Sequence, residues 1–226
     1  MKYLDFEEVM SPERMSRYLV ATNDNTKKAM TLYRKNLQLS QEMFTVISCF
    51  EVAFRNKINE QYSSQFGTDW LRESISQTGF FNKTTCIRTK KIIERAYKNL
   101  VNYSHPKLLA SLDFGFWRYL YAQPQFYAGG QTLLKIFPSK PTSTSQIQYN
   151  HTYVFTQLEI INEFRNRIAH HEPVCFRRGT SITDSAFCLQ HYNLILQLFQ
   201  WMNINESALL YGLDHVQSIC NEIDGI

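Results

Sequence analysis

The apolar residues of this chain recur mainly at spacings of three and four, the pattern of an α-helix with one buried face. From Asn23 or Asp24 to about Phe66 there is neither glycine nor proline, so we expect one long helix or two nearly continuous ones. Alternating strand patterns and hairpin signals are few. The pattern therefore predicts an all-α bundle that forms a single domain over residues 1–226.

Shorter helices are expected on either side of this segment. A capping serine followed by proline, Ser11-Pro12, predicts the start of a helix that runs to about Val20. The other predicted helices cover residues 82–100, 106–120, 148–171, 184–202 and 206–223. Residues 138–146, with the sequence PSKPTSTSQ, are expected to form a polar loop.

Aromatic side chains are concentrated between residues 114 and 121. Such rings can stack on the bases of a single-stranded nucleic acid, but at helical spacing they more often belong to a protein core. We therefore expect five buried rings here: Phe114, Phe116, Trp117, Tyr119 and Tyr121.

Composition is that of a globular protein, with 44% hydrophobic residues. No stretch approaches the roughly 18 uninterrupted apolar residues of a transmembrane helix, and the acidic start MKYLDFEEVM is unlike a secretory signal. We expect no membrane association and a cytoplasmic location. Five widely spaced cysteines without a C-x-x-C pair predict reduced, mostly buried thiols, not disulfides or a zinc site.

The densest group of polar and ionisable side chains is FRNRIAHHEP, residues 164–173, at the end of a predicted helix. On a helix Asn166 and His170 share one face, and Arg165 lies on the adjoining flank. Pro173 disfavours helical geometry at the residue before it, so the helix should end near His171, where the helix dipole favours positive charge.

These side chains suit a substrate that contains phosphate, because arginine binds phosphate oxygens through a fixed fork of donors and histidine exchanges a proton near neutral pH. RNA carries its own nucleophile, the 2′-hydroxyl, so cleavage needs proton transfer and charge stabilisation but no metal or other cofactor. From spacing alone, a polar helix end with surface salt bridges and capping histidines explains the pattern equally well.

Three segments resemble the Abi-like proteins (abortive infection, AbiD/AbiF type) of the HEPN superfamily: residues 32–71, residues 108–122 and RNRIAHHEP, residues 165–173. The mark of that superfamily is arginine, usually a polar residue, and then histidine after four to six intervening residues. Arg165, Asn166 and His170 match it as an R-x4-H motif. The resemblance implies a HEPN-like helical bundle with additional helices.

The same resemblance implies a homodimer in which two motifs meet in one composite cleft, and a metal-independent endoribonuclease that leaves a 2′,3′-cyclic phosphate. Arg165 would stabilise the phosphorane, His170 would transfer a proton and Asn166 would orient either of them. His171 and Glu172 would support the site. It also implies phage defence, by a toxin-like activity that an antitoxin protein or a noncoding RNA restrains.

Two further groups of charged residues are candidates for the site. Glu51 and Arg55 lie four residues apart within the long helix, and we favour an internal ion pair that braces the bundle. The alternative is that Glu51 orients Arg165 or His170 from a facing helix.

The most basic stretch is residues 82–100, where six lysines and arginines face a single acid, Glu94. Four cations on one helical stripe are expected to contact the RNA backbone without reading base sequence: Arg88, Lys91, Arg95 and Lys98. A solvated charged face is the competing explanation. Ile92, Ile93 and Tyr97 are expected to point toward the interior.

A non-cleaving RNA-binding sensor or scaffold of a defence or toxin–antitoxin system is the main alternative function. Its RNA binding would survive loss of His170 and disappear with loss of Arg165. A metal-dependent nuclease is less favoured, because the sequence lacks H-E-x-x-H and shows no assembled carboxylate cluster.

Overall fold

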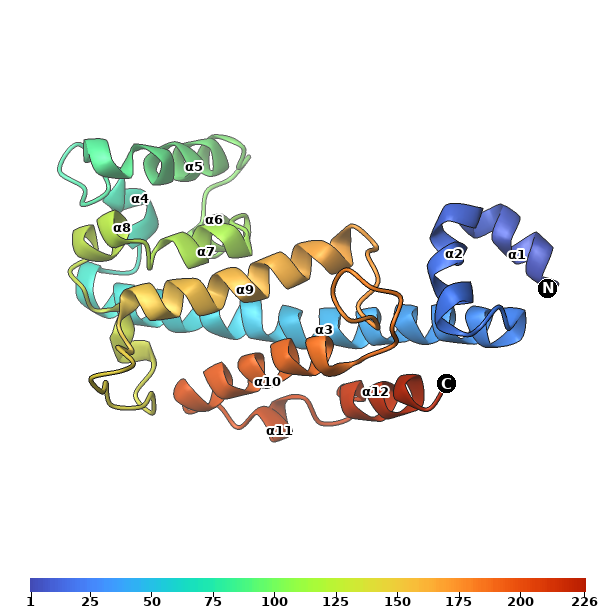
Figure 1. Ribbon diagram of the computed structural model, residues 1–226. Helices are drawn as coiled ribbons and strands as arrows, with labels where there is room; N and C mark the ends of the chain where they lie inside the picture. Colours follow the sequence, from blue (N-terminus) through green and yellow to red (C-terminus); the bar gives the residue numbers. More distant parts are fainter. The chain divides into compact units, whose positions relative to one another are not determined.

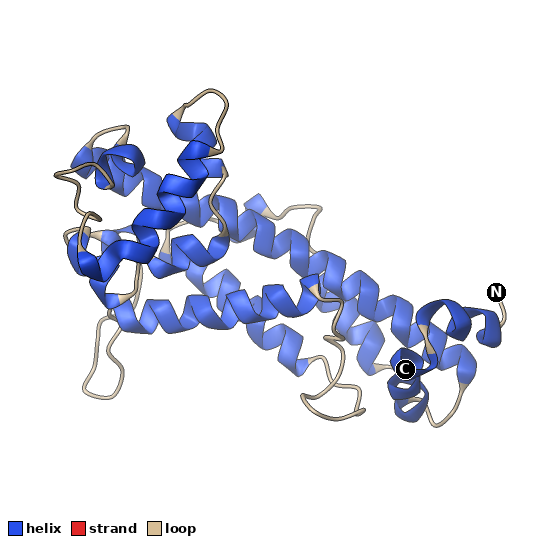
Figure 2. Cartoon of the chain, turned by 90° about the horizontal axis from the view of Figure 1, so that it is seen from above, coloured by secondary structure: helices blue, strands red, loops and turns tan.

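The computed structural model describes residues 1–226. The chain consists of helices and loops, without a β-strand (Figures 1 and 2). The expected all-α architecture is confirmed. The α-helices are α1 Tyr3–Met10, α2 Pro12–Ala21, α3 Thr26–Phe66, α4 Trp70–Ser74, α5 Ile87–Lys98, α6 His105–Ala110, α7 Phe114–Tyr119, α8 Gln123–Ala128, α9 His151–Ala169, α10 Ala186–Trp201, α11 Glu206–Leu209 and α12 Val216–Asp224. Short 3₁₀ turns cover Thr84–Cys86 and Leu133–Ile136. No helix combines the length and the apolar composition that crossing a membrane requires.

The residues form two compact units. The first unit contains residues 1–49, 163–197 and 206–226, and the second contains residues 50–162 and 198–205. Three helices, α3, α9 and α10, contribute residues to both units. The expectation of a single domain over the whole chain stays a prediction.

In the first unit, α2 begins as predicted, with the Ser11 hydroxyl accepting a hydrogen bond from the Arg14 amide (3.3 Å) and Pro12 at the first helical position. The sequence pattern did not predict α1. Its one buried side chain is Phe6, which packs against Tyr33 with a ring separation of 5.5 Å. A single buried residue leaves no periodic signal in the sequence.

The long segment without glycine or proline forms one helix, α3, of 41 residues. It ends where predicted, because Gly67 follows with a φ of 92°, a conformation that glycine adopts without steric cost. The Gly67 amide donates to the carbonyl of Ser63 (3.0 Å) and so closes the last turn.

The second unit has an aromatic core, in which Phe54 stacks on Phe50 at 5.6 Å and on Tyr121 at 5.8 Å. Four of the five rings expected in the core are buried, but the prediction for Tyr119 was wrong, since it is 43% exposed. The predicted single helix over residues 106–120 is two helices, and Asp113 caps the second through the Phe116 amide (2.8 Å). This break shifts the helical phase, so the spacing counted from Leu108 does not extend to Tyr119.

Figure 1 shows α4, α5, α6, α7 and α8 gathered beside one another in the second unit. Helix α5 buries only Thr89 and Ile93, which lie one turn apart. The predicted interior positions of Ile92 and Tyr97 were therefore wrong, because these side chains are 46% and 38% exposed. The Thr89 hydroxyl accepts a hydrogen bond from the buried Gln125 amide (3.0 Å), which accounts for a polar residue on the packed face.

Candidate functional site

Helix α9 carries the predicted motif and is held by a row of buried side chains. As predicted, these recur at spacings of three and four: Val154, Leu158, Ile161, Phe164 and Ile168. The helix begins slightly later than predicted, because the Asn150 side chain caps it by accepting from the Tyr153 amide (3.0 Å). The apolar row fixes the rotation of the helix and therefore the direction of its polar face.

The carboxyl-terminal end of α9 is closed by a Schellman motif. The His171 amide donates to the carbonyl of Ile168 (2.9 Å), and the Glu172 amide donates to the carbonyl of Arg167 (3.0 Å). His171 has a φ of 57°, the left-handed conformation that this turn requires. The prediction that the helix ends near His171 is confirmed.

The structure brings Arg165, Asn166 and His170 together at this helix end. The His170 amide donates to the carbonyl of Asn166 (2.9 Å), so helical geometry extends as far as His170. The side chains of Asn166 and His170 are therefore on the same face, one turn apart, and both are exposed. Arg165 is half-buried. The arrangement leaves an imidazole and an amide accessible to a ligand beside an arginine.

Arg167 and Glu172 shape the turn that follows the motif. The Arg167 Nε donates to the carbonyl of Pro173 (3.0 Å), and its Nη1 lies 3.6 Å from a carboxylate oxygen of Glu172. The guanidinium also lies 5.6 Å from the ring centre of Phe187. Glu172 thus pairs with a neighbouring arginine, and its predicted support of the catalytic group stays a prediction.

Residues 171–185, which we call the post-motif segment, are anchored by helices from the start of the chain. The buried Asn36 side chain of α3 accepts hydrogen bonds from the amides of Val174 (2.8 Å) and Cys175 (3.2 Å). From α2, Arg14 donates to the carbonyl of His171 (2.9 Å), and Arg17 donates through Nε to the carbonyl of Thr180 (2.8 Å).

The sequence pattern did not point to these three anchoring residues. Asn36 did leave a signal, since it is an amide on the buried face of α3, between Tyr33 and Leu39. A polar side chain at such a position needs a hydrogen-bond partner, which here is the backbone of the post-motif segment.

Behind the motif, Phe164 stacks on the ring of His191 at 4.3 Å. The Nδ1 of His191 lies 2.7 Å from the carbonyl of Phe187, and burial lowers the pKa of His191. This histidine is therefore part of the packing under α9. Its position is unlike that of the exposed His170.

Four of the five cysteines are buried, which confirms the expectation of mostly buried thiols. Burial raises the pKa of Cys175 to about 12, so its thiolate is disfavoured and it is a poor nucleophile. No group of three or more His, Cys, Asp or Glu side chains is placed to hold a metal ion.

The remaining predicted site residues belong to the second unit. Glu51 and Arg55 are both half-buried, and the Nε of Arg55 has no hydrogen-bond partner. The ion pair between them stays a prediction. The four cations predicted to contact RNA are all exposed on α5: Arg88, Lys91, Arg95 and Lys98.

His171→Gly is expected to raise the free energy of unfolding by about 1 kcal/mol, because glycine adopts the left-handed conformation without the Cβ clash. Urea denaturation of both proteins measures the difference. His171→Ala keeps the Cβ and should give no such gain. A less stable His171→Gly protein would show that the imidazole itself stabilises the helix end.

The family model described as Abi-like protein covers residues 3–175, which include the motif and the beginning of the post-motif segment. Neither the curated proteins nor the solved structures contain a match. The resemblance to Abi-like proteins is thereby confirmed, whereas placement in the HEPN superfamily stays a prediction. Since the matched region is well over half of its length, the chain belongs to the Abi-like protein family.

Proposed function

We propose that this protein is a metal-independent endoribonuclease that acts in abortive infection. Family membership suggests the role in phage defence. The observation that carries the proposed chemistry is the end of α9, where exposed His170 lies one turn beyond exposed Asn166, next to Arg165. The Schellman motif and the anchored post-motif segment hold this helix end in place, as a site that positions reacting groups requires.

In the proposed reaction the 2′-hydroxyl of one nucleotide attacks the adjacent phosphorus, and the bond from phosphorus to the 5′-oxygen breaks. One proton leaves the 2′-oxygen and one is delivered to the 5′-oxygen, so the products are a 2′,3′-cyclic phosphate and a 5′-hydroxyl. His170 transfers a proton, and the guanidinium of Arg165 stabilises the negative charge of the phosphorane. Asn166 orients either group through its amide.

The reaction needs a proton acceptor and a proton donor on opposite sides of the phosphorus. His170 and His171 are both exposed, but only His170 lies within the helical geometry of α9, and His171 forms the closing turn. A second copy of the chain would supply the second His170. We therefore include in the proposal a homodimer with a composite cleft, restrained in the cell by an antitoxin protein or a noncoding RNA.

The proposal is tested with wild-type protein and labelled RNA in excess chelator. We expect cleavage to continue and the fragments to end in a 2′,3′-cyclic phosphate, identified by mass spectrometry. The matched control is the same RNA with a 2′-deoxynucleotide on the 5′ side of the cleaved bond, which should resist cleavage at that position because the nucleophile is gone. Cleavage of the deoxy-substituted bond, or its dependence on added metal, would rule the mechanism out.

The same samples distinguish a non-cleaving RNA-binding protein from a ribonuclease. A sensor or scaffold would bind RNA without cutting it in any of these conditions. Its binding would persist in His170→Ala and disappear in Arg165→Ala, because only the arginine would hold phosphate.

A further inference from the structure

Two cavities of about 370 and 340 Å³ lie between α5 and the segment that begins at Ser111 and continues through α7. Both are lined by residues of the second unit. Ile92 and Asp113 line both cavities, which therefore lie next to each other. We call the two together the α5–α7 groove.

The groove divides the four exposed cations of α5 into two pairs. Arg88 lines the first cavity and Arg95 the second, whereas Lys91 and Lys98 line neither. Arg88 and Arg95 are seven residues apart, or about 10 Å along the helix axis. The one acid of α5, Glu94, lies 3.7 Å from Lys90. The wall of the groove thus carries two guanidinium groups about two helical turns apart.

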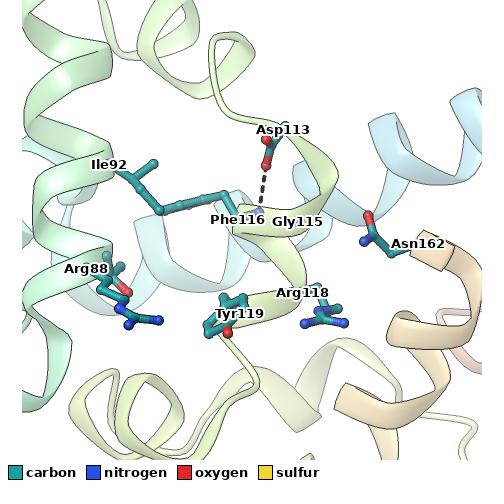
Figure 3. Close-up of a pocket in the computed structure, with 9 residues that line it drawn as sticks. Arg88, Ile92, Asp113, Gly115, Phe116, Arg118, Tyr119 and Asn162 are labelled. Carbon is teal, nitrogen blue, oxygen red and sulfur yellow. Dashed lines mark hydrogen bonds between the residues drawn. The ribbon is translucent and has the colours of Figure 1, made fainter. Parts of the chain in front are cut away.

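An exposed aromatic ring lies on the opposite wall. Figure 3 shows Tyr119 between Arg88 and Arg118 in the first cavity. The ring of Tyr119 is held edge-to-face against Phe155 at 5.8 Å. Arg118 is fixed by a hydrogen bond to Glu159 (2.8 Å). The ring therefore has a defined position while 43% of the residue stays exposed.

The remaining lining gives the groove a polar edge and an apolar surface. Asn162 supplies an amide that can donate and accept hydrogen bonds, and the exposed Ile92 supplies apolar contact. The carboxylate of Asp113 is engaged as the cap of α7, with one oxygen accepting from the Phe116 amide (2.8 Å). Negative charge in the groove is thus partly offset by the start of a helix, while Arg88 and Arg95 each line one of the two cavities.

We propose that the α5–α7 groove binds a short single-stranded segment of RNA, with phosphates at Arg88 and Arg95 and a base stacked on Tyr119. Guanidinium groups suit the backbone, and a partly exposed ring suits a base that is not paired, which excludes a regular duplex. This inference rests on RNA being the substrate class of the proposed function. It adds that the protein selects unpaired RNA and that two of the four α5 cations do most of the binding.

The test measures the Kd of a fluorescein-labelled single-stranded oligoribonucleotide by anisotropy, in a His170→Ala background so that the RNA stays intact. We expect Arg88→Ala/Arg95→Ala to raise the Kd about tenfold or more and Lys91→Ala/Lys98→Ala, which removes the same charge from the same helix, to raise it about threefold at most. The slope of log Kd against log salt should fall by about 1.4 in the arginine variant, at about 0.7 for each phosphate that the protein no longer neutralises.

Tyr119 is tested in the same assay. Tyr119→Leu should raise the Kd about tenfold, whereas Tyr119→Phe, which keeps the ring, should stay within about twofold of the parent. A duplex of the same sequence and the free mononucleotides should bind more weakly than the single strand. Equal losses in the arginine and lysine variants, or duplex binding as tight as single-strand binding, would overturn the groove assignment. Circular dichroism confirms that each variant is folded.

The proposal for the groove and the proposal for ribonuclease activity can be refuted independently. If wild-type protein cleaves RNA but the arginine and lysine variants bind alike, the groove is refuted and the proposed reaction stands. If the wild-type protein cuts nothing while the arginine variant loses binding, the groove stands as part of a non-cleaving RNA-binding protein.

Discussion

His170→Ala is expected to lower the rate of RNA cleavage by about 10²- to 10⁴-fold, because proton transfer by a positioned side chain contributes an acceleration of that size. His170 is exposed, so its removal leaves no cavity in the core. The helix end should persist, since the hydrogen bonds of the Schellman motif come from the backbone. Single-turnover rates on one labelled RNA, in chelator, measure the effect.

Two other histidines provide the controls. His171→Gly removes the adjacent imidazole while preserving the backbone turn, and it should slow cleavage far less than His170→Ala. His215→Ala removes an exposed histidine that contacts Glu42 outside the motif, and it should leave the rate unchanged. Sedimentation checks that all variants keep the oligomeric state of the wild type. Equal losses in His170→Ala and His171→Gly would contradict the assignment of the proton-transfer residue.

Asn36→Ala is expected to lower the free energy of unfolding by about 2–6 kcal/mol, since each of two buried donors left without a partner costs about 1–3 kcal/mol. The substitution would strand the amides of Val174 and Cys175, which both donate to the Asn36 side chain. Urea denaturation measures the loss. Cleavage should fall as well, although Asn36 contacts no substrate in the proposal, because the post-motif segment no longer holds the end of α9.

The matched control for this variant is Asn56→Ala, which removes an exposed amide from the same helix. It should change the free energy of unfolding by no more than about 0.5 kcal/mol. If the two variants proved equally stable, ordered water would have to replace the Asn36 side chain, and the anchoring role would be withdrawn.

Most of the fold was accessible from the sequence where helices are long and their ends are marked. Helix α3 follows from a segment without glycine or proline that stops at Gly67, and α2 follows from Ser11 and Pro12. The errors fall on short helices and on the packed face of α5. A helix of six residues such as α7 has fewer than two turns, so one break at its cap changes which side chains are buried.

Only the motif residues of the candidate site, which are close in sequence, could be predicted from the sequence. Arg165, Asn166 and His170 lie within six residues, so helical spacing alone places them together. The residues that hold the helix end are far from the motif in the sequence. Asn36 lies 138 positions from Val174, and Arg14 lies 157 positions from His171, so no local periodicity connects them. The α5–α7 groove depends in the same way on how α5 packs, and here the prediction that Ile92 points toward the interior was wrong.

The anchoring of the post-motif segment has a consequence for the protein during its own synthesis. Helix α2 is made early, but the carbonyl of Thr180 that Arg17 binds appears 163 residues later. On the ribosome, the end of α9 therefore stays unanchored until the post-motif segment has emerged. Under the proposed function, the site at the end of α9 would therefore be completed only after that segment has been made.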